Sequence, residues 1–275
     1  MSIWINSVKG VTKYRINNRI VLILGELHDQ SIVCSRKGAG ISVFDYLKER
    51  AADNDRAIFL LEFNTSNTTD YSRIGSKIIR DVFTGGVNNV RDKTRGVDTR
   101  LDCITQTNQN ILYNDDTQLY NIYVNPVLRR RSTTPSMISM FIATYIDPYY
   151  KKGQLECGDD EKLLDYKKDL TATFDDVKAR LGKSGNLFAT DDKFRDEIMT
   201  TIRWGWARLM DFEILREIRS VDSSNEIIIV VGNNHRKNIR DTMRGWIDSI
   251  ELLNIDERTE KDCLSREKLQ IVDLS

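Results

Sequence analysis

The fold of this chain is decided by the stretch Val21-Leu22-Ile23-Leu24-Gly25-Glu26-Leu27-His28. The same pattern returns near the other end of the chain, in Ile227-Ile228-Ile229-Val230-Val231-Gly232-Asn233-Asn234-His235. Short aliphatic runs of this kind are typical of strands that are buried on both faces. The glycine that ends each run lets the backbone turn sharply. Both Gly-x-x-His motifs are therefore predicted just past the carboxyl ends of buried strands, where open α/β sheets bind ligands.

The two histidines of these motifs are the whole histidine content of the chain, and more than two hundred residues separate them. Histidine is the side chain best suited to ligate a metal or to move protons near neutral pH. A histidine after a strand can also cap a helix or pack in a core. The repetition of the same context at His28 and His235 favours a shared functional site over packing alone.

The segments around the first motif predict a βαβ unit. Residues 12–24 read as a hairpin that turns at Asn17-Asn18. A long loop that carries His28 follows, and a helix begins near Ser42, with Asp45 as the partner in a capping box. Residues 57–62 are a second buried strand. Because a strand–helix–strand unit makes its strands parallel, we expect Glu62 at the same edge as the first motif.

The rest of the pattern gives an α/β class with a mainly parallel central sheet flanked by helices. Residues 96–98 and 118–124 are further strand candidates, and amphipathic stripes predict helices over 160–181 and 193–220. A strand at 226–231 precedes a helix that is expected to run to about residue 253, and 269–272 is a candidate edge strand. We expect one domain over 1–275, with 102–220 a mainly helical insertion or cover.

Composition narrows the function classes. Lys+Arg and Asp+Glu both number 41, so there is no strong signal for nucleic acid, and the cluster at 129–131 reads as a solvated loop. The apolar runs are too short for a membrane segment, and no signal peptide is recognised. The 4 cysteines are scattered, which is typical of free thiols in the cytoplasm or another reducing compartment. The oligomeric state is not predicted.

The strand ends offer a catalytic or metal-binding set. It comprises two imidazoles and two carboxylates: Glu26, His28, Glu62 and His235. Such a set can hold a divalent metal, such as Mn²⁺, Co²⁺ or Zn²⁺, that activates water. It can also act without metal, one histidine serving as general base and a second group as acid.

Three further residues are secondary candidates: Asp29, Asp98 and Arg100. Asp98 stands at the end of a predicted strand, but it can equally cap the turn behind that strand. The flanking Arg95 and Arg100 can bind a carboxylate or phosphate, or form surface ion pairs.

These motifs resemble a known group of proteins. Gly25-Glu26-Leu27-His28-Asp29 resembles the opening motif of ChaN-like haem and iron-uptake proteins, and a near relative of that motif opens the erythromycin esterases. Leu60-Leu61-Glu62 resembles their second glutamate, and residues 230–235 resemble their late Val-Gly-x-x-His. Paired Gly-x-x-His motifs also mark the TraB, pheromone-shutdown and TIKI proteins. The resemblance covers roughly 18–100 and 224–250.

The resemblance implies an α/β core like that of ChaN and the erythromycin esterases, with a Glu/His site. It implies metal-dependent proteolysis in the TIKI branch, lactone hydrolysis in the esterase branch and haem binding in the ChaN branch. The chain departs from the TIKI and ChaN patterns in lacking a recognisable signal or lipidation cysteine near its start. We expect a soluble hydrolase that acts on an ester, lactone or peptide bond of a small molecule or peptide. The alternatives are a protein that binds haem or another ligand without turnover, and a degenerate member with a structural or interaction role.

Overall fold

The structure is a computed structural model that falls into two compact units, one of residues 1–98 and 217–275 and the other of residues 99–216. The residues that it describes are 4–5, 8–26, 40–63, 77–84, 88–98, 134–147, 160–220, 226–246, 248–256 and 264–265. The bounds of the second unit, 99–216, are close to those of the predicted insertion, 102–220. The predictions for His28, Asp29 and Arg100, and for strands at 118–124 and 269–272, concern residues outside the described ones.

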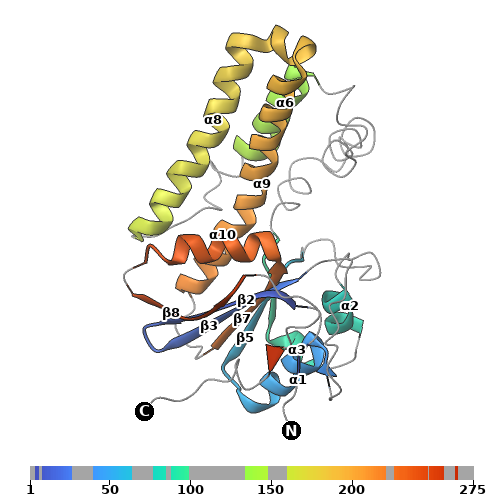
Figure 1. Ribbon diagram of the computed structural model, residues 1–275, viewed down its shortest axis with the longest axis vertical. Helices are drawn as coiled ribbons and strands as arrows, with labels where there is room; N and C mark the ends of the chain where they lie inside the picture. The colour runs from blue at the N-terminus through green and yellow to red at the C-terminus, as the bar shows by residue number, and fades with distance from the viewer. Residues whose placement is uncertain are drawn as a thin grey trace. The chain divides into compact units, whose positions relative to one another are not determined.

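The first unit is built on a mixed sheet of six strands, in the order β6-β5-β7-β3-β2-β8 (Figure 1). The bounds of these strands are Thr94–Gly96, Ala57–Leu61, Glu226–Gly232, Arg19–Glu26, Val8–Ile16 and Ser249–Ile255. The first four are parallel to one another, whereas β2 pairs antiparallel with both β3 and β8. The α/β class is confirmed. The short strands β4 (Gly40–Ile41), β1 (Trp4–Ile5) and β9 (Leu264–Ser265) form a second, three-stranded sheet.

The predicted hairpin and βαβ unit are both present. Strands β2 and β3 meet at a turn in which Asn17 has a φ of 51°, a conformation that asparagine tolerates better than most residues. Strands β3 and β5 run in the same direction, and β7 lies between them and pairs with each. The late strand therefore completes the centre of the sheet, although it is far away in sequence.

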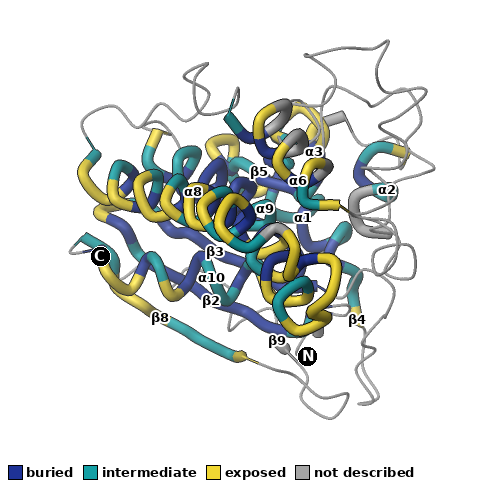
Figure 2. Tube along the Cα trace, turned by 90° about the horizontal axis from the view of Figure 1, so that it is seen from above, coloured by how far each residue is buried: buried dark blue, intermediate teal, exposed yellow. Residues whose placement is uncertain are grey.

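One face of the sheet packs against α1 (Val43–Asp53), α2 (Lys77–Thr84) and α3 (Asn88–Asp92) around an apolar core. The core includes alternate residues of the central strands, such as Leu24, Leu61 and Val230. Helix α1 begins at the predicted capping box, in which the Ser42 hydroxyl accepts from the Asp45 N–H at 3.0 Å. Figure 2 shows β3 and β5 as buried, in contrast with the edge strand β8.

Helix α10 (Asn233–Met243) packs on the other face, over β2, β3 and β7 (Figure 1). Its close approach depends on Gly10 and Gly25, because a Cβ at either position would lie 2.5 Å from Oδ1 of Asn233. Real Cβ atoms do not come this close to another heavy atom. Because these two positions have no side chain, the first turn of α10 can pack closely on the sheet.

The prediction of one helix up to about residue 253 is wrong. Helix α10 ends at Met243, and Ser249–Ile255 is the edge strand β8. The Ser249 hydroxyl donates to the carbonyl oxygens of Met243 and Trp246 at 2.5 and 3.1 Å, and so caps the end of the helix. Gly245 was the available stop signal in the sequence. The strand predicted at 96–98 is displaced by two residues, because β6 runs from Thr94 to Gly96 and leaves Asp98 outside the strand.

The second unit is helical in its described residues. It contains α6 (Pro135–Phe141), the π-helix η4 (Ile142–Ile146), α8 (Glu161–Thr190) and most of α9 (Asp192–Ser220). The predicted stripe of α8 is buried: Leu163, Leu170, Phe174, Val177 and Leu181. The α9 backbone packs closely on Phe174, since a Cβ at Gly205 would lie 2.8 Å from that ring. Among the described helices, none is long and apolar enough to cross a membrane.

The close packing of α10 on Gly10 and Gly25 gives a first prediction. We expect Gly25→Ala to lower the free energy of unfolding by about 1–3 kcal/mol, because overpacking forces the helix or the strand to move. Gly245→Ala is the matched control, since its Cβ would lie 3.4 Å from the Thr242 carbonyl oxygen, close to ordinary contact. Denaturant unfolding measures both variants, and equal stabilities for them would contradict the close packing of α10.

Candidate functional site

The carboxyl ends of three parallel strands, β3, β5 and β7, bring three of the predicted residues to one edge of the sheet. In the register of the sheet, Glu26 of β3 lies opposite Gly232 of β7, and Leu61 of β5 lies opposite Val230. Glu62 directly follows Leu61, and the backbone N–H of Glu62 donates to the Val230 carbonyl oxygen at 3.2 Å. Glu26, Glu62 and the start of α10 are thus at the ends of three successive strands.

Glu62 joins the end of β5 to the start of α10. Its Oε2 accepts a hydrogen bond from the backbone N–H of Gly232 at 2.7 Å. Gly232 is the N-cap residue of α10 and has no side chain to cap the helix. A carboxylate at a helix N-terminus is also favoured by the helix dipole. The structural role of Glu62 therefore explains part of its presence at the end of an apolar strand.

His235 is the third residue of α10 and faces the same carboxylate. Its Nε2 lies 3.7 Å from Oε1 of Glu62, and the two side chains are 12% and 10% exposed. This distance is an ion-pair contact when the imidazole is protonated, and it is slightly longer than a hydrogen bond. The pair is screened from bulk water but remains accessible, which suits a group that exchanges protons with a bound molecule.

Glu26 is buried at the neighbouring strand end, with 4% of its surface exposed. The pleat of β3 assigns it to the face of Leu24, which is the core face covered by α1. On β5, Leu61 belongs to that core face, so the following position is assigned to the opposite face. The structure thus brings Glu62 and His235 together, and it places Glu26 beside them in register but on the other face.

The described part of the chain contains no group of three or more His, Cys, Asp or Glu side chains placed to hold a metal ion. Glu62 and His235 supply two potential ligands, whereas catalytic zinc sites use three protein ligands. A metal centre at this edge needs a third ligand, and His28 is the residue that the sequence offers. The metal and haem expectations stay predictions.

Asp98 lies one strand further along the same edge. Its backbone N–H donates to the Phe63 carbonyl oxygen at 3.2 Å, which continues the pairing of β6 with β5 beyond the end of both strands. The neighbouring Arg95 forms an ion pair with Glu217 at 2.7 Å. For Arg95, the surface ion pair is therefore the arrangement that is present.

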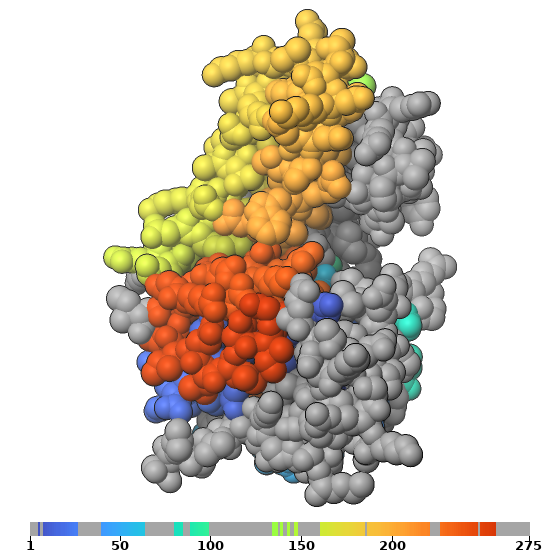
Figure 3. Space-filling model, in the orientation of Figure 1, coloured from blue at the N-terminus to red at the C-terminus, as the bar shows by residue number. Residues whose placement is uncertain are grey.

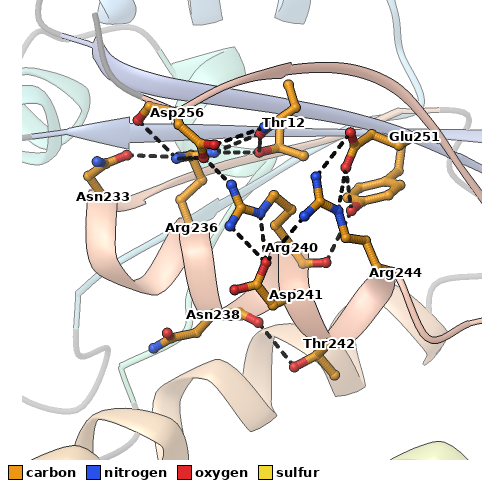
Figure 4. A network of polar contacts seen from close by, with 12 residues as sticks. Thr12, Asn233, Arg236, Asn238, Arg240, Asp241, Thr242, Arg244, Glu251 and Asp256 are labelled. Carbon is orange, nitrogen blue, oxygen red and sulfur yellow. Dashed lines mark hydrogen bonds and ion pairs between the residues drawn. The ribbon is translucent and has the colours of Figure 1, made fainter.

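Sequence reasoning missed a buried arginine that directly follows His235. Arg236 is fully buried, and all three of its guanidinium nitrogens donate hydrogen bonds (Figure 4). Burial lowers the pKa of Arg236, and the nearby Asp256 carboxylate opposes this shift. The signal for this residue was Gly10, which leaves space for a side chain from elsewhere in the fold.

The polar network continues along α10 towards β8 (Figure 4). Arg240 forms ion pairs with Asp256 and with Asp241. Arg244 pairs with Glu251 at 3.0 Å, and this hydrogen bond lowers the pKa of the Glu251 carboxyl. Helix α10 is therefore attached to the edge strand at several points. Figure 3 shows α10 and β8 as one continuous area of the surface.

A second buried charge pair lies at the opposite, amino-terminal edge of the sheet. Arg50 of α1 donates to Oε2 of Glu226, the first residue of β7, at 2.8 and 3.1 Å. Glu226 is 1% exposed, and burial lowers the pKa of the nearby Lys13. Because the arginine and the carboxylate satisfy each other, we interpret this pair as a structural tie between α1 and the sheet.

Comparison of the chain with family models, curated proteins and solved structures finds no match.

The two roles of Glu62 can be separated by mutation. We expect Glu62→Ala to lower the free energy of unfolding by about 1–3 kcal/mol, because the Gly232 N–H loses its acceptor. Glu62→Gln retains an acceptor oxygen and should lose clearly less. Denaturant unfolding near pH 7 checks the difference, and equal losses in the two variants would show that the bond to Gly232 does not stabilise the fold.

Proposed function

We propose that the chain is a hydrolase that cleaves an ester, lactone or peptide bond, with Glu62 and His235 as its proton-transfer pair. The observation that carries the proposal is the contact of Glu62 with His235, 3.7 Å apart, at the carboxyl ends of parallel strands. Ligands of open α/β sheets bind at this edge. The resemblance to the ChaN, erythromycin-esterase and TIKI group, with its Glu/His site, supports the same reading.

The geometry gives each residue a role. With the imidazole proton on Nε2, directed towards Oε1 of Glu62, the Nδ1 of His235 is the nitrogen that accepts a proton. A water molecule that attacks the substrate carbonyl carbon transfers its proton to Nδ1 as its oxygen bonds to that carbon. The Glu62 carboxylate stabilises the resulting imidazolium, which then protonates the leaving alcohol or amine. The 3.7 Å separation shortens as the charge develops, as is usual for catalytic pairs.

The remaining predicted residues have narrower roles in this proposal. His28 is the candidate second acid, or the third ligand if a divalent metal takes part. Glu26 lies at the adjacent strand end, on the other face of the sheet. A metal held by His28, His235 and Glu62 would supply an activated water.

The test is a panel of generic nitrophenyl ester, lactone and fluorogenic peptide substrates, each with and without added Mn²⁺, Co²⁺ or Zn²⁺. We expect His235→Ala and Glu62→Gln to lower kcat by about 10²–10⁴-fold while the far-ultraviolet circular dichroism is unchanged, because a positioned base typically contributes this much.

The matched control is Glu251→Gln. Glu251 is a glutamate of the same sheet, but it lies away from the carboxyl ends of the parallel strands. Its register partner on β2 is Tyr14, which lies opposite Val21 near the amino end of β3. We expect it to retain the rate of the wild type. Wild-type rates in His235→Ala and Glu62→Gln would contradict the proposal. A Soret band after haem addition, together with no turnover, would favour the ligand-binding alternative.

A further inference from the structure

The buried guanidinium of Arg236 donates hydrogen bonds to four residues. Its Nε donates to Oδ1 of Asn233 at 2.7 Å, and its Nη1 donates to Oγ1 of Thr12 at 2.6 Å and to Oδ1 of Asn254 at 3.2 Å. Its Nη2 donates to the carbonyl oxygen and to Oδ1 of Asp256, both at 3.1 Å. Arg236 thus links the first turn of α10 to β2 and to the end of β8.

Burying a charged guanidinium is costly, and well-packed apolar side chains can often replace a buried ion pair without loss of stability. Stability alone is therefore a weak reason for this arrangement. What the network gives is a fixed geometry, since a planar guanidinium with all of its nitrogens engaged has one allowed position and orientation.

The residue fixed by this geometry is His235. Asn233 and Arg236 stand on either side of it in the first turn of α10, and they bond to each other. The turn has no room to move towards the sheet, because Gly10 and Gly25 already lie against Asn233 and Arg236. On its other side, the turn is held by the bond from Gly232 to Glu62.

We propose that Arg236 is a positioning residue that holds His235 against Glu62, and that it makes the geometry of this pair depend on the end of the edge strand β8. The inference rests on the proposed function and adds a point of control to the same site. Asp256, which directly follows β8, has a side chain that is 51% exposed and also binds Arg240. It is the accessible end of an otherwise buried link, so a change there reaches the pair through Arg236.

The test uses Asp256→Asn and Arg236→Lys in the full chain, with Arg244→Lys as the matched control. Arg244 is the C-cap residue of α10 and also joins this helix to β8, through Glu251, but it lies about two helical turns beyond Arg236. The readout is the imidazole resonances of histidine-labelled protein. The chain contains 2 histidines, and His235→Ala identifies the signals of His235 by their loss.

We expect the His235 resonances to move in Asp256→Asn and in Arg236→Lys, and to stay in place in Arg244→Lys, while circular dichroism shows that all three are folded. On a substrate from the panel, we expect kcat to fall about tenfold in the first two variants with KM unchanged, because a misplaced base affects the chemical step rather than binding.

The outcomes separate the two proposals. If His235→Ala retains turnover, the proposed function fails, and the resonances still decide whether Arg236 positions the imidazole. If Arg236→Lys does not fold, Asp256→Asn tests the inference alone. We expect this variant to fold, because the side chain that it changes is half-exposed. Wild-type His235 resonances in folded Asp256→Asn would overturn the inference, and so would an equal shift in Arg244→Lys.

Discussion

The contact between the first turn of α10 and the sheet is the constraint on which the rest of the first unit depends. It requires two positions without side chains, Gly10 and Gly25, and a buried guanidinium that fills the space above them. Because an uncompensated buried charge costs several kcal/mol, Arg236 can be there only with its hydrogen bonds made. Those bonds fix α10 to β2 and β8, and they bring together segments from both ends of the chain.

The same contact sets the surroundings of the candidate site. Since α10 begins directly after β7, fixing its first turn fixes the N–H of Gly232, which Glu62 caps, and the side chain of His235. Glu62 therefore has two roles: it caps α10 through the Gly232 N–H, and it contacts the imidazole of His235. This dual role means that loss of activity in a Glu62 variant says little until stability has been measured in the same variant.

The sequence predicted most of the central sheet because the signals were local. Alternation and turn chemistry gave the hairpin, the capping box gave the start of α1, and the βαβ rule gave the parallel direction of β3 and β5. It failed at residues 244–253. There, apolar residues fit a helical stripe and an edge strand equally well, and pairing with β2 decided between them.

For the site, the sequence by itself determined which residue types stand at the strand ends, because each follows an apolar run that has to be a buried strand. Tertiary structure decided which of them meet. The insertion of β7 between β3 and β5 brings His235 to Glu62, and the pleat assigns Glu26 to the other face. Strand order and the fit of α10 onto two glycines depend on contacts between residues that are distant in sequence, and no local pattern of residues encodes those contacts.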